Sequence, residues 1–547
     1  MKLLFISPLE KHLPGTQKSP TALAGLQALW GETVSFQILC RFDPEEADRL
    51  YILPQVTCPG CRVQVFRQEV VPCTFPCAPN ASGAYLTRKP ALMPDPLLPW
   101  NGEPLRLRAD RDRLLWVDVQ VPYGAADTAV EVALLDRSGH PLARQTLPLQ
   151  VVPVALAEQT TRHSQWFYAD CLCQRYGCGM FSEEFYRIAA AYWRCAAEHG
   201  VDTLLTPVFT PSLDVEPGGQ RMRGQLVRVE RRGDDYIFDF AELERWVRTA
   251  RDCGIGWFEI APFFTQWGAK HPVTVYAEPD GTPLFGWQNP ADDPEYGRFL
   301  AALLPRLMDY FTALGVQDRV LFHISDEPSG ENLEAYRRAR AKIEPWVGGS
   351  PILDALSDPA FAREGLVTVP VAAEDYLAPF LRRRTGPLWT YSCCCQDKKV
   401  PNVFLSMPLT RARVLGALLY KERLDGYLRW GYNFWFSQFS LRPIDPWQNT
   451  DADGGFPSGD AFLVYPGQGG EPVPSLRLKT LRDAWQDLRA LQALEQRAGR
   501  AAALDCIRQH LGPVSFTRYP ADPARYQAFR QAVNDRLLQT TGKQEQV

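Results

Sequence analysis

The segment Val320-Leu321-Phe322-His323-Ile324-Ser325-Asp326-Glu327-Pro328 carries an apolar run directly into two adjacent carboxylates. Its first five residues have the composition of a buried strand, and helical patterning follows near 331–344. The same alternation of strand and helix recurs from about residue 160 onward. Strands are predicted at 165–168, 203–206, 257–260, 320–324, near 351–353, near 366–369, 387–391 and 426–430. Helices are predicted near 182–198, 240–253, 294–314, 331–344, 409–423 and 475–496.

Eight units of this kind within roughly 330 residues are typical of a (β/α)8 barrel, an α/β fold. The alternative is an open doubly wound sheet, which usually has a glycine-rich first turn. The nearest candidate for that turn, Gly177-Cys178-Gly179, lacks the third glycine, since Ser182 stands there. We therefore expect a TIM-like catalytic barrel over residues 158–500.

The N-terminal part of the chain, residues 1–157, has a different pattern, with period-two alternation and no helical periodicity. Strands are predicted at 33–39, 114–121, 130–135 and 150–154. Short strands separated by turn-forming residues indicate an antiparallel β-sandwich domain ahead of the barrel. The final part, residues 501–547, is charged and helical in pattern, so we expect a C-terminal helical extension.

Composition excludes several classes of protein. The 547 residues are 46% hydrophobic and 22% charged, as in a globular chain that buries a large core. The net charge of −4 leaves no basic excess, which argues against a nucleic-acid partner. No apolar stretch is long enough to span a membrane, and the apolar run within residues 1–8 is too short for a signal peptide. We therefore expect a cytoplasmic protein without a membrane partner, and its oligomeric state stays open.

The 14 cysteines are interpreted as free thiols in a reducing compartment. Cys58 and Cys61, followed by Cys73 and Cys77, have a spacing that could hold zinc, but their surroundings resemble strands rather than a zinc knuckle. Free thiols are favoured there, and metal binding stays open. We predict no cofactor, and the seven histidines are too scattered along the sequence for a metal-dependent deacetylase.

The adjacent acids Asp326 and Glu327 follow the fourth predicted strand, and catalytic groups of such barrels lie at the carboxyl ends of strands. Two like charges at a partly dry mouth raise the pKa of one of them, which leaves one carboxyl protonated and one ionised. Glycosidic cleavage needs that combination. The alternative is a polar helix start, where acids favour the helix dipole. The position after the fourth strand favours catalysis.

Adjacent acids do not suit the usual glycosidase pair, whose carboxyls come from separate strands on opposite sides of the scissile bond. They suit a reaction in which the substrate's own 2-acetamido oxygen attacks the anomeric carbon. Asp326 would orient the acetamido group and stabilise its developing positive charge. Glu327 would protonate the leaving oxygen and then deprotonate the incoming water.

The ends of the other strands are rich in aromatic and polar side chains, which bind the faces and hydroxyls of sugar rings. Core packing is the alternative for any single aromatic, but their concentration at strand ends predicts a sugar pocket and a glycan substrate. The predicted substrate-binding residues are Trp166, Asp170, Gln266, Trp267, His323, Tyr391, Trp430, Asn433 and Trp435. For His323 we favour hydrogen bonding behind the acids over metal ligation.

As a set, these motifs resemble the catalytic domain of glycoside hydrolase family 123, the β-N-acetylgalactosaminidases and their uncharacterised bacterial relatives. The matching segments are Trp166-Phe167-Tyr168-Ala169-Asp170, Leu205-Thr206-Pro207, 264–271, 322–328, 425–433, 459–467, Ser475-Leu476-Arg477-Leu478 and Leu481-Arg482-Asp483. The resemblance covers about 165–490 and the arrangement of the N-terminal β-sandwich. One departure is Tyr168, where we expect a histidine in many relatives, so the specificity can differ.

The resemblance implies a retaining glycoside hydrolase that removes β-linked N-acetylhexosamine, in this family N-acetylgalactosamine, by substrate-assisted catalysis. Asp326 would be the acetamido stabiliser, Glu327 the general acid/base and Tyr391 a further partner of the acetamido group. Two alternatives stay open: a glycosidase that acts on a non-acetamido sugar, and a non-catalytic carbohydrate-binding relative. Galacto or gluco preference, the aglycone and exo or endo action are also open.

Overall fold

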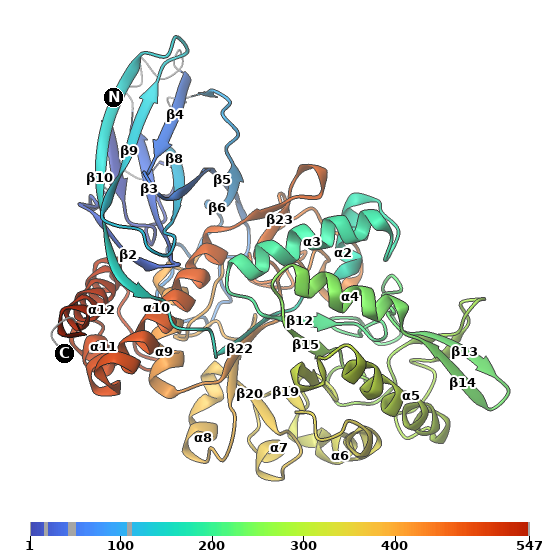
Figure 1. Cartoon of the computed structure of the whole chain (residues 1–547). Helices are drawn as coiled ribbons and strands as arrows, with labels where there is room; N and C mark the ends of the chain where they lie inside the picture. The colour runs from blue at the N-terminus through green and yellow to red at the C-terminus, as the bar shows by residue number, and fades with distance from the viewer. Residues whose placement is uncertain (1, 16–19, 42–50, 107–111, 545–547) are drawn as a thin grey trace.

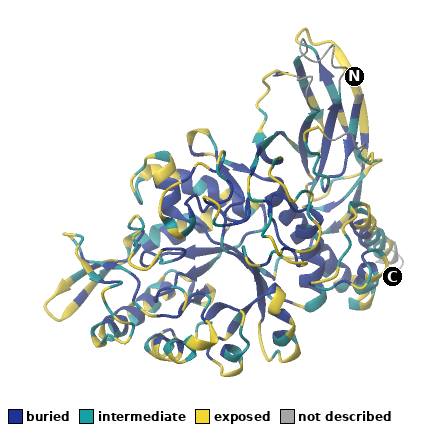
Figure 2. Cartoon of the chain, turned by 180° about the vertical axis from the view of Figure 1, so that it is seen from behind, coloured by how far each residue is buried: buried dark blue, intermediate teal, exposed yellow. Residues whose placement is uncertain are grey.

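A computed structural model describes residues 2–15, 20–41, 51–106 and 112–544. Two five-stranded sheets form the N-terminal part, and an eight-stranded sheet ringed by helices forms the centre (Figure 1). The C-terminal helices lie beside the base of the N-terminal sheets (Figure 1). Figure 2 shows buried residues along the central strands and exposed residues on the outer sides of the surrounding helices.

The two N-terminal sheets share one hydrophobic core. The first has the order β1 (Lys2–Ile6), β3 (Thr33–Arg41), β8 (Arg113–Gln120), β5 (Arg62–Cys73) and β6 (Ala91–Pro99). The second has the order β2 (Leu26–Trp30), β10 (Pro141–Ala155), β9 (Thr128–Leu135), β4 (Tyr51–Thr57) and β7 (Leu105–Arg106). Alternation along the strands directs Phe36 and Val117 of the first sheet and Val132 of the second into that core.

The predicted strands of this region overlap β3, β8, β9 and β10, so an antiparallel sheet region is confirmed. The second sheet is mixed, however, because β2 pairs with β10 in parallel. Strands β3 to β9 lie between β2 and β10 in the sequence, so no hairpin forces these two strands to run antiparallel.

The central sheet is a nearly closed parallel barrel. Its strands are β11 (Arg162–Gln165), β12 (Thr203–Thr206), β15 (Trp257–Ile260), β18 (Val320–Phe322), β19 (Leu353–Leu356), β20 (Val369–Ala373), β21 (Trp389–Ser392) and β22 (Gly426–Arg429). Their order is β18-β15-β12-β11-β22-β21-β20-β19. The edge strands β18 and β19 meet through one parallel bridge, between Phe322 and Ile352. The eight strands expected from the sequence are therefore present.

Three predicted strand positions differ from the structure. The first strand, β11, ends at Gln165 instead of continuing to Tyr168, because Tyr168 already stands at the N-terminus of α2 (Ala169–Tyr176). The strand expected near 366–369 is β20, which begins only at Val369. The strand expected near 351–353 is β19, which begins at Leu353. The apolar run 166–169 follows β11 instead of forming it, while β19 and β20 lie in apolar runs longer than the strands, so composition does not locate the strand ends.

The helices expected from the sequence are present. They are α3 (Glu183–Glu198), α4 (Ala241–Asp252), α5 (Pro294–Ala313), α6 (Leu333–Ile343), α9 (Thr410–Glu422) and α10 (Leu476–Ala498). Two short helices, α7 (Ala360–Arg363) and α8 (Leu377–Arg382), follow β19 and β20. Small hairpins are formed by β13 (Arg228–Arg232) with β14 (Asp235–Asp239), β16 (Val275–Tyr276) with β17 (Pro283–Phe285), and β23 (Val464–Pro466) with β24 (Pro472–Pro474).

The expected C-terminal extension contains α11 (Arg500–His510) and α12 (Pro523–Gln544), and its last residues, 545–547, lie outside the described part. Helix α12 packs against β2, β10 and α10. In the described part of the chain, no helix has both the length and the apolarity that crossing a membrane requires.

Helix α10 joins the barrel to the first N-terminal sheet through buried charges. Arg477 pairs with Asp95 of β6 at 2.8 Å. Lys479 and Arg482 both contact Asp118 of β8, at 2.7 and 2.9 Å. Because both ends of each pair are buried, removing one partner would leave an uncompensated charge. The sequence motifs 475–478 and 481–483 therefore hold the sheet on the barrel.

Candidate active site

A cavity of about 570 Å³, its open mouth included, lies at the carboxyl ends of the barrel strands. Asp326 and Glu327 line it together, four and five residues after β18 ends. Seven residues expected from the sequence line this cavity: Trp166, Gln266, Trp267, Asp326, Glu327, Tyr391 and Trp430. The remaining lining residues are Tyr168, Leu213, Asp214, Ala355, Cys393, Cys394, Leu428 and Phe456.

Asp326 is buried, with 3% of its surface exposed, yet only half of its carboxylate is satisfied. Its Oδ2 accepts a hydrogen bond from Nε2 of Gln266 at 2.7 Å. Its Oδ1 is also buried and has no hydrogen-bond partner among the described residues. An acceptor oxygen of this kind at a cavity wall is available to a donor group on a ligand.

Glu327 has a left-handed backbone, with φ of +46°, and is followed by Pro328. A non-glycine residue in this conformation is strained by about 1–3 kcal/mol, and such strain is concentrated at functional sites. The turn brings the Glu327 carboxylate to the hydroxyl of Tyr391 on β21, which donates to Oε1 at 2.9 Å. The two adjacent acids thereby contact different sides of the cavity: Asp326 the loop after β15, and Glu327 the strand β21.

Burial raises the pKa of both acids. For Asp326 the rise is large, and the neighbouring Glu327 charge adds to it, while the His323 charge opposes it. For Glu327 the Tyr391 hydrogen bond opposes the rise. Both carboxyls are therefore protonated more readily than exposed acids, and because they are neighbours, ionisation of one disfavours ionisation of the other.

A buried charge network lies behind the acids. His323 donates to Glu259 at 2.6 Å through Nε2 and to Asp354 at 2.7 Å through Nδ1, and all three side chains are 0% exposed. Burial alone would lower the pKa of His323, but these two hydrogen bonds raise it to about 10. This raised pKa favours a charged His323 between Glu259 and Asp354, close behind Asp326.

The same network positions one aromatic wall of the cavity. Nε1 of the Trp166 indole donates to Oε1 of Glu259 at 2.6 Å, and Ser164 of β11 bonds the other oxygen. On the neighbouring wall, Nε1 of Trp430 donates to Asp460 at 3.0 Å. Both indoles line the cavity with their nitrogen atoms already bonded, so their rings are held in place.

Trp267 forms the exposed rim. It is 40% exposed, has a left-handed backbone and makes an edge contact with Phe439 at a ring-centroid distance of 6.1 Å. The loop that carries Phe439 is tied to the cavity by Asp214, whose Oδ2 accepts from the Phe439 amide at 3.0 Å. The Asp214 amide in turn donates to Gln266 at 2.8 Å. A continuous chain of hydrogen bonds thus leads from the rim loop through Gln266 to Asp326.

Asp214 is a lining residue that the sequence patterns do not indicate. It is 8% exposed, and burial raises its pKa to about 6. Asp214 lies in the long irregular connection between β12 and β13, where no periodicity distinguishes one residue from another. The available signal was an acid within a long loop after a barrel strand.

Besides His323, which lies behind the acids, three residues expected at the sugar pocket lie outside its lining. Asp170 forms a bidentate pair with Arg221, both contacts being 2.7 Å. The Asn433 amide bonds both backbone groups of Tyr168, at 2.9 and 3.0 Å. Trp435 is 2% exposed and donates to the carbonyl of Val464 at 3.3 Å. These side chains stabilise the segments behind the cavity walls.

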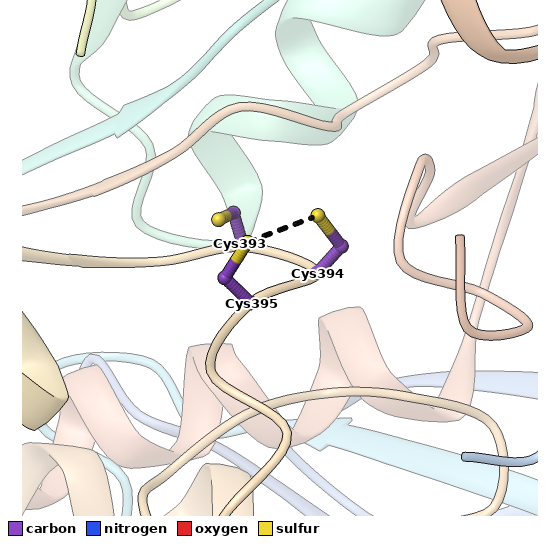
Figure 3. Close-up of side chains that lie close together, drawn as sticks. All are labelled: Cys393, Cys394 and Cys395. Atoms are coloured by element: carbon purple, nitrogen blue, oxygen red, sulfur yellow. Dashed lines mark hydrogen bonds between the residues drawn. The ribbon is translucent and has the colours of Figure 1, made fainter. Parts of the chain in front are cut away.

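The cysteines gather in a different place from the one that the sequence indicated. Cys61 precedes β5 and Cys73 ends it, and a strand of that length spans roughly 36 Å, too far for one ion. Within the described ranges, one group of three or more possible ligands has all its donor atoms within 4.8 Å, namely Cys393, Cys394 and Cys395 (Figure 3).

Comparison with known proteins gives a match to one family model. A model of the glycoside hydrolase 123 catalytic domain matches residues 166–494, more than half of the chain. No curated protein matches the chain in sequence.

One solved structure gives the same fold over the full length of the chain. A family 123 glycoside hydrolase from Clostridium perfringens, described in terms of glycolipid glycan hydrolysis, has a TM-score of 0.74 and 13% identity. That match covers 100% of this chain and 99% of the other. A glycosyl hydrolase family 2 member from Bacteroides cellulosilyticus has a TM-score of 0.29 and 9% identity, and the match covers 82% of this chain and 49% of that one.

Proposed function

The chain belongs to the glycoside hydrolase 123 family and is a glycosidase, and from this we propose a specific reaction. The enzyme removes β-linked N-acetylhexosamine, N-acetylgalactosamine in particular, from glycans. It does so with retention of configuration, by substrate-assisted catalysis in which Asp326 stabilises the 2-acetamido group and Glu327 is the general acid/base.

The unpartnered Oδ1 of Asp326 is the observation that carries the proposal. A sugar with a free 2-hydroxyl can also donate to a carboxylate, but only an acetamido group develops a positive charge there during reaction. Asp326 already holds Gln266 on its other oxygen, so its orientation does not change when the substrate arrives. A preoriented carboxylate stabilises that charge more in the transition state than in the bound substrate.

In the first step the acetamido oxygen forms a bond to the anomeric carbon as the glycosidic bond breaks. The proton of Glu327 goes to the departing oxygen, and the aglycone leaves as an alcohol. The intermediate is a bicyclic oxazolinium ion, and its N–H donates to Asp326. Water then attacks the anomeric carbon, gives its proton to Glu327 and restores the acetamido group. Two inversions at one carbon give net retention.

The surroundings of Glu327 suit an acid that must be protonated before substrate turnover. Burial raises its pKa, so that it holds a proton nearer to neutral pH than an exposed glutamate does. The Tyr391 hydroxyl at 2.9 Å keeps the carboxyl in one orientation. Trp166 and Trp430 offer flat faces for the pyranose ring inside the cavity.

The test is a matched set of nitrophenyl β-glycosides: N-acetylgalactosaminide, N-acetylglucosaminide, galactoside and glucoside. We expect turnover of the acetamido sugars only, with the galacto sugar faster. Glu327→Gln should lower kcat by about 10²–10⁴-fold. The control is Glu331→Gln, which changes an exposed glutamate close by in sequence. Equal turnover of an acetamido sugar and its 2-hydroxy counterpart would refute substrate assistance, and full activity of Glu327→Gln would refute the acid/base role.

A further inference from the structure

Three consecutive cysteines, Cys393, Cys394 and Cys395, form part of the turn after β21 (Figure 3). Cys393 and Cys394 line the same cavity as Glu327, while Cys395 is exposed to solvent. The proposed glycosidase reaction uses none of these thiols. Their place at the cavity wall means that any ligand held by them also affects access of the sugar.

The three sulfur atoms are spaced as ligands of one ion. All lie within 4.8 Å of one another, and Sγ of Cys394 is 3.8 Å from Sγ of Cys395. Tetrahedral zinc with bonds of about 2.3 Å to sulfur requires sulfur atoms about 3.8 Å apart. Small rotations of the third thiol would complete the same spacing. The chain therefore presents three soft ligands at nearly the geometry that a thiophilic cation needs.

The turn is also held in place by its neighbours. The Cys393 amide donates to Oε1 of Gln396 at 2.9 Å, and Nδ2 of Asn402 donates to the Cys393 carbonyl at 2.9 Å. Nε2 of Gln396 donates to Asp375 at 2.9 Å. These bonds restrain the backbone that carries the thiols, which lowers the entropy lost when an ion binds.

We propose that Cys393, Cys394 and Cys395 bind one thiophilic divalent cation of the zinc class, and that the bound ion reversibly inhibits the glycosidase. The three thiols release their protons to solvent and form three metal–sulfur bonds, with no change in oxidation state. A fourth coordination position stays open, as in zinc sites with three protein ligands. Because two of the ligands line the cavity, the ion narrows the space for the sugar, so inhibition is competitive.

Direct binding is tested by titrating the full-length protein with Cd²⁺ and recording the ultraviolet thiolate-to-cadmium absorption. We expect a saturable band with one Cd²⁺ per chain. Cys395→Ser, which changes an exposed residue, should weaken Cd²⁺ binding at least about 10-fold. Cys61→Ser is the matched control, since it alters the other cysteine cluster that the sequence singled out, and should leave the band unchanged. A band absent from the wild type, or equal in Cys395→Ser, would overturn the proposal.

Inhibition is tested with Zn²⁺ and an aryl glycoside that the enzyme hydrolyses, each variant being compared with its own uninhibited rate. Zn²⁺ should raise KM without changing kcat, a chelator should reverse the effect, and Cys395→Ser should need at least about 10-fold more Zn²⁺. Equal inhibition of Cys395→Ser and wild type would overturn the proposal. The Cd²⁺ band does not depend on turnover, so failure of the proposed sugar specificity is distinguishable from failure of the metal site.

Discussion

Two aspartates of this chain are equally buried, at 3% exposure each, and have opposite environments. Asp118 of the N-terminal sheet pairs with Lys479 and Arg482 and accepts further hydrogen bonds from Ser35 and Trp116. Asp326 at the barrel mouth accepts one hydrogen bond, from Gln266, and has a free oxygen.

The pKa values of Asp118 and Asp326 are shifted in opposite directions because their surroundings differ. Burial acts to raise both, but the charges of Arg482 and Lys479 hold the pKa of Asp118 well below its usual range. At Asp326 burial prevails, aided by the charge of Glu327, and the pKa rises well above its usual range. Burial alone therefore does not identify a reactive acid. A buried acid with all its partners stabilises the fold, and one with partners missing is available to a substrate.

Among the substitutions that test this difference between Asp118 and Asp326, a change at Asp326 should have the largest effect, and that effect is on activity. Asp326→Asn should lower kcat about 10²–10³-fold, because the amide cannot offset the positive charge that develops on the acetamido group. Its melting temperature should be equal to or higher than that of the wild type, because an amide needs no buried charge. Kinetics with an aryl N-acetylgalactosaminide, together with calorimetry, measure both. A large loss of stability would mean that Asp326 is structural.

The same change at the other aspartate, Asp118→Asn, should lower the stability of the protein and leave its activity almost unchanged. It leaves Lys479 and Arg482 buried without a counter-charge, which costs about 3–5 kcal/mol of unfolding free energy. Denaturant unfolding measures this loss. The kcat of the protein that stays folded should change by less than about 2-fold, since Asp118 lies outside the cavity lining. An unchanged unfolding free energy would contradict the role assigned to this pair.

The raised pKa of His323 should make the stability of the protein depend on pH. Its pKa in the fold, about 10, is above its unfolded value, so its stabilising contribution is complete below about pH 6.5 and is lost as the pH rises through about 10. His323→Gln should remove this alkaline loss and lower stability near neutral pH by about 3 kcal/mol. Unfolding free energies measured from neutral to alkaline pH test it. Identical profiles for both proteins would show that His323 is neutral in the fold.

The smallest effect is expected from a substitution at Asp214, and it is an effect on stability. Its pKa, raised to about 6 by burial, favours the protonated acid, so its contribution is complete below about pH 4 and is lost as the pH rises through about 6. Asp214→Asn imitates the protonated form and should stabilise the protein by about 1–3 kcal/mol near pH 7. Unfolding measured across this range should show a flatter profile for the variant. A variant less stable at neutral pH would contradict the assignment.

Features that depend on a short stretch of residues could be predicted from the sequence. Buried strands such as 203–206 and 257–260 are apolar runs bounded by helical patterns, so periodicity located them. The acidic pair was recognisable because it follows such a strand after a gap of only three residues. The aromatic lining residues Trp166 and Trp430 were found for the same reason, since each immediately follows a strand end.

Features that depend on the conformation of loops could not be predicted from sequence patterns. Asn433 and Trp435 follow β22 closely, but the loop turns back and places them behind the wall, on Tyr168 and Val464. Asp214 lies at the site because of the path that the long connection between β12 and β13 takes. The thiols of 393–395 converge because of the turn that Gln396 and Asn402 hold, which no spacing rule indicates.

In the proposed reaction the acetamido group of the substrate is the nucleophile, assisted by Asp326 and Glu327. The most direct measurement is kcat/KM for aryl β-hexosaminides whose N-acetyl group carries increasing numbers of fluorine atoms. Fluorine withdraws electrons from the attacking carbonyl oxygen, so we predict a steep fall in kcat/KM along the series. A rate that is insensitive to fluorination would contradict the account, because it would assign the attack to a group of the enzyme.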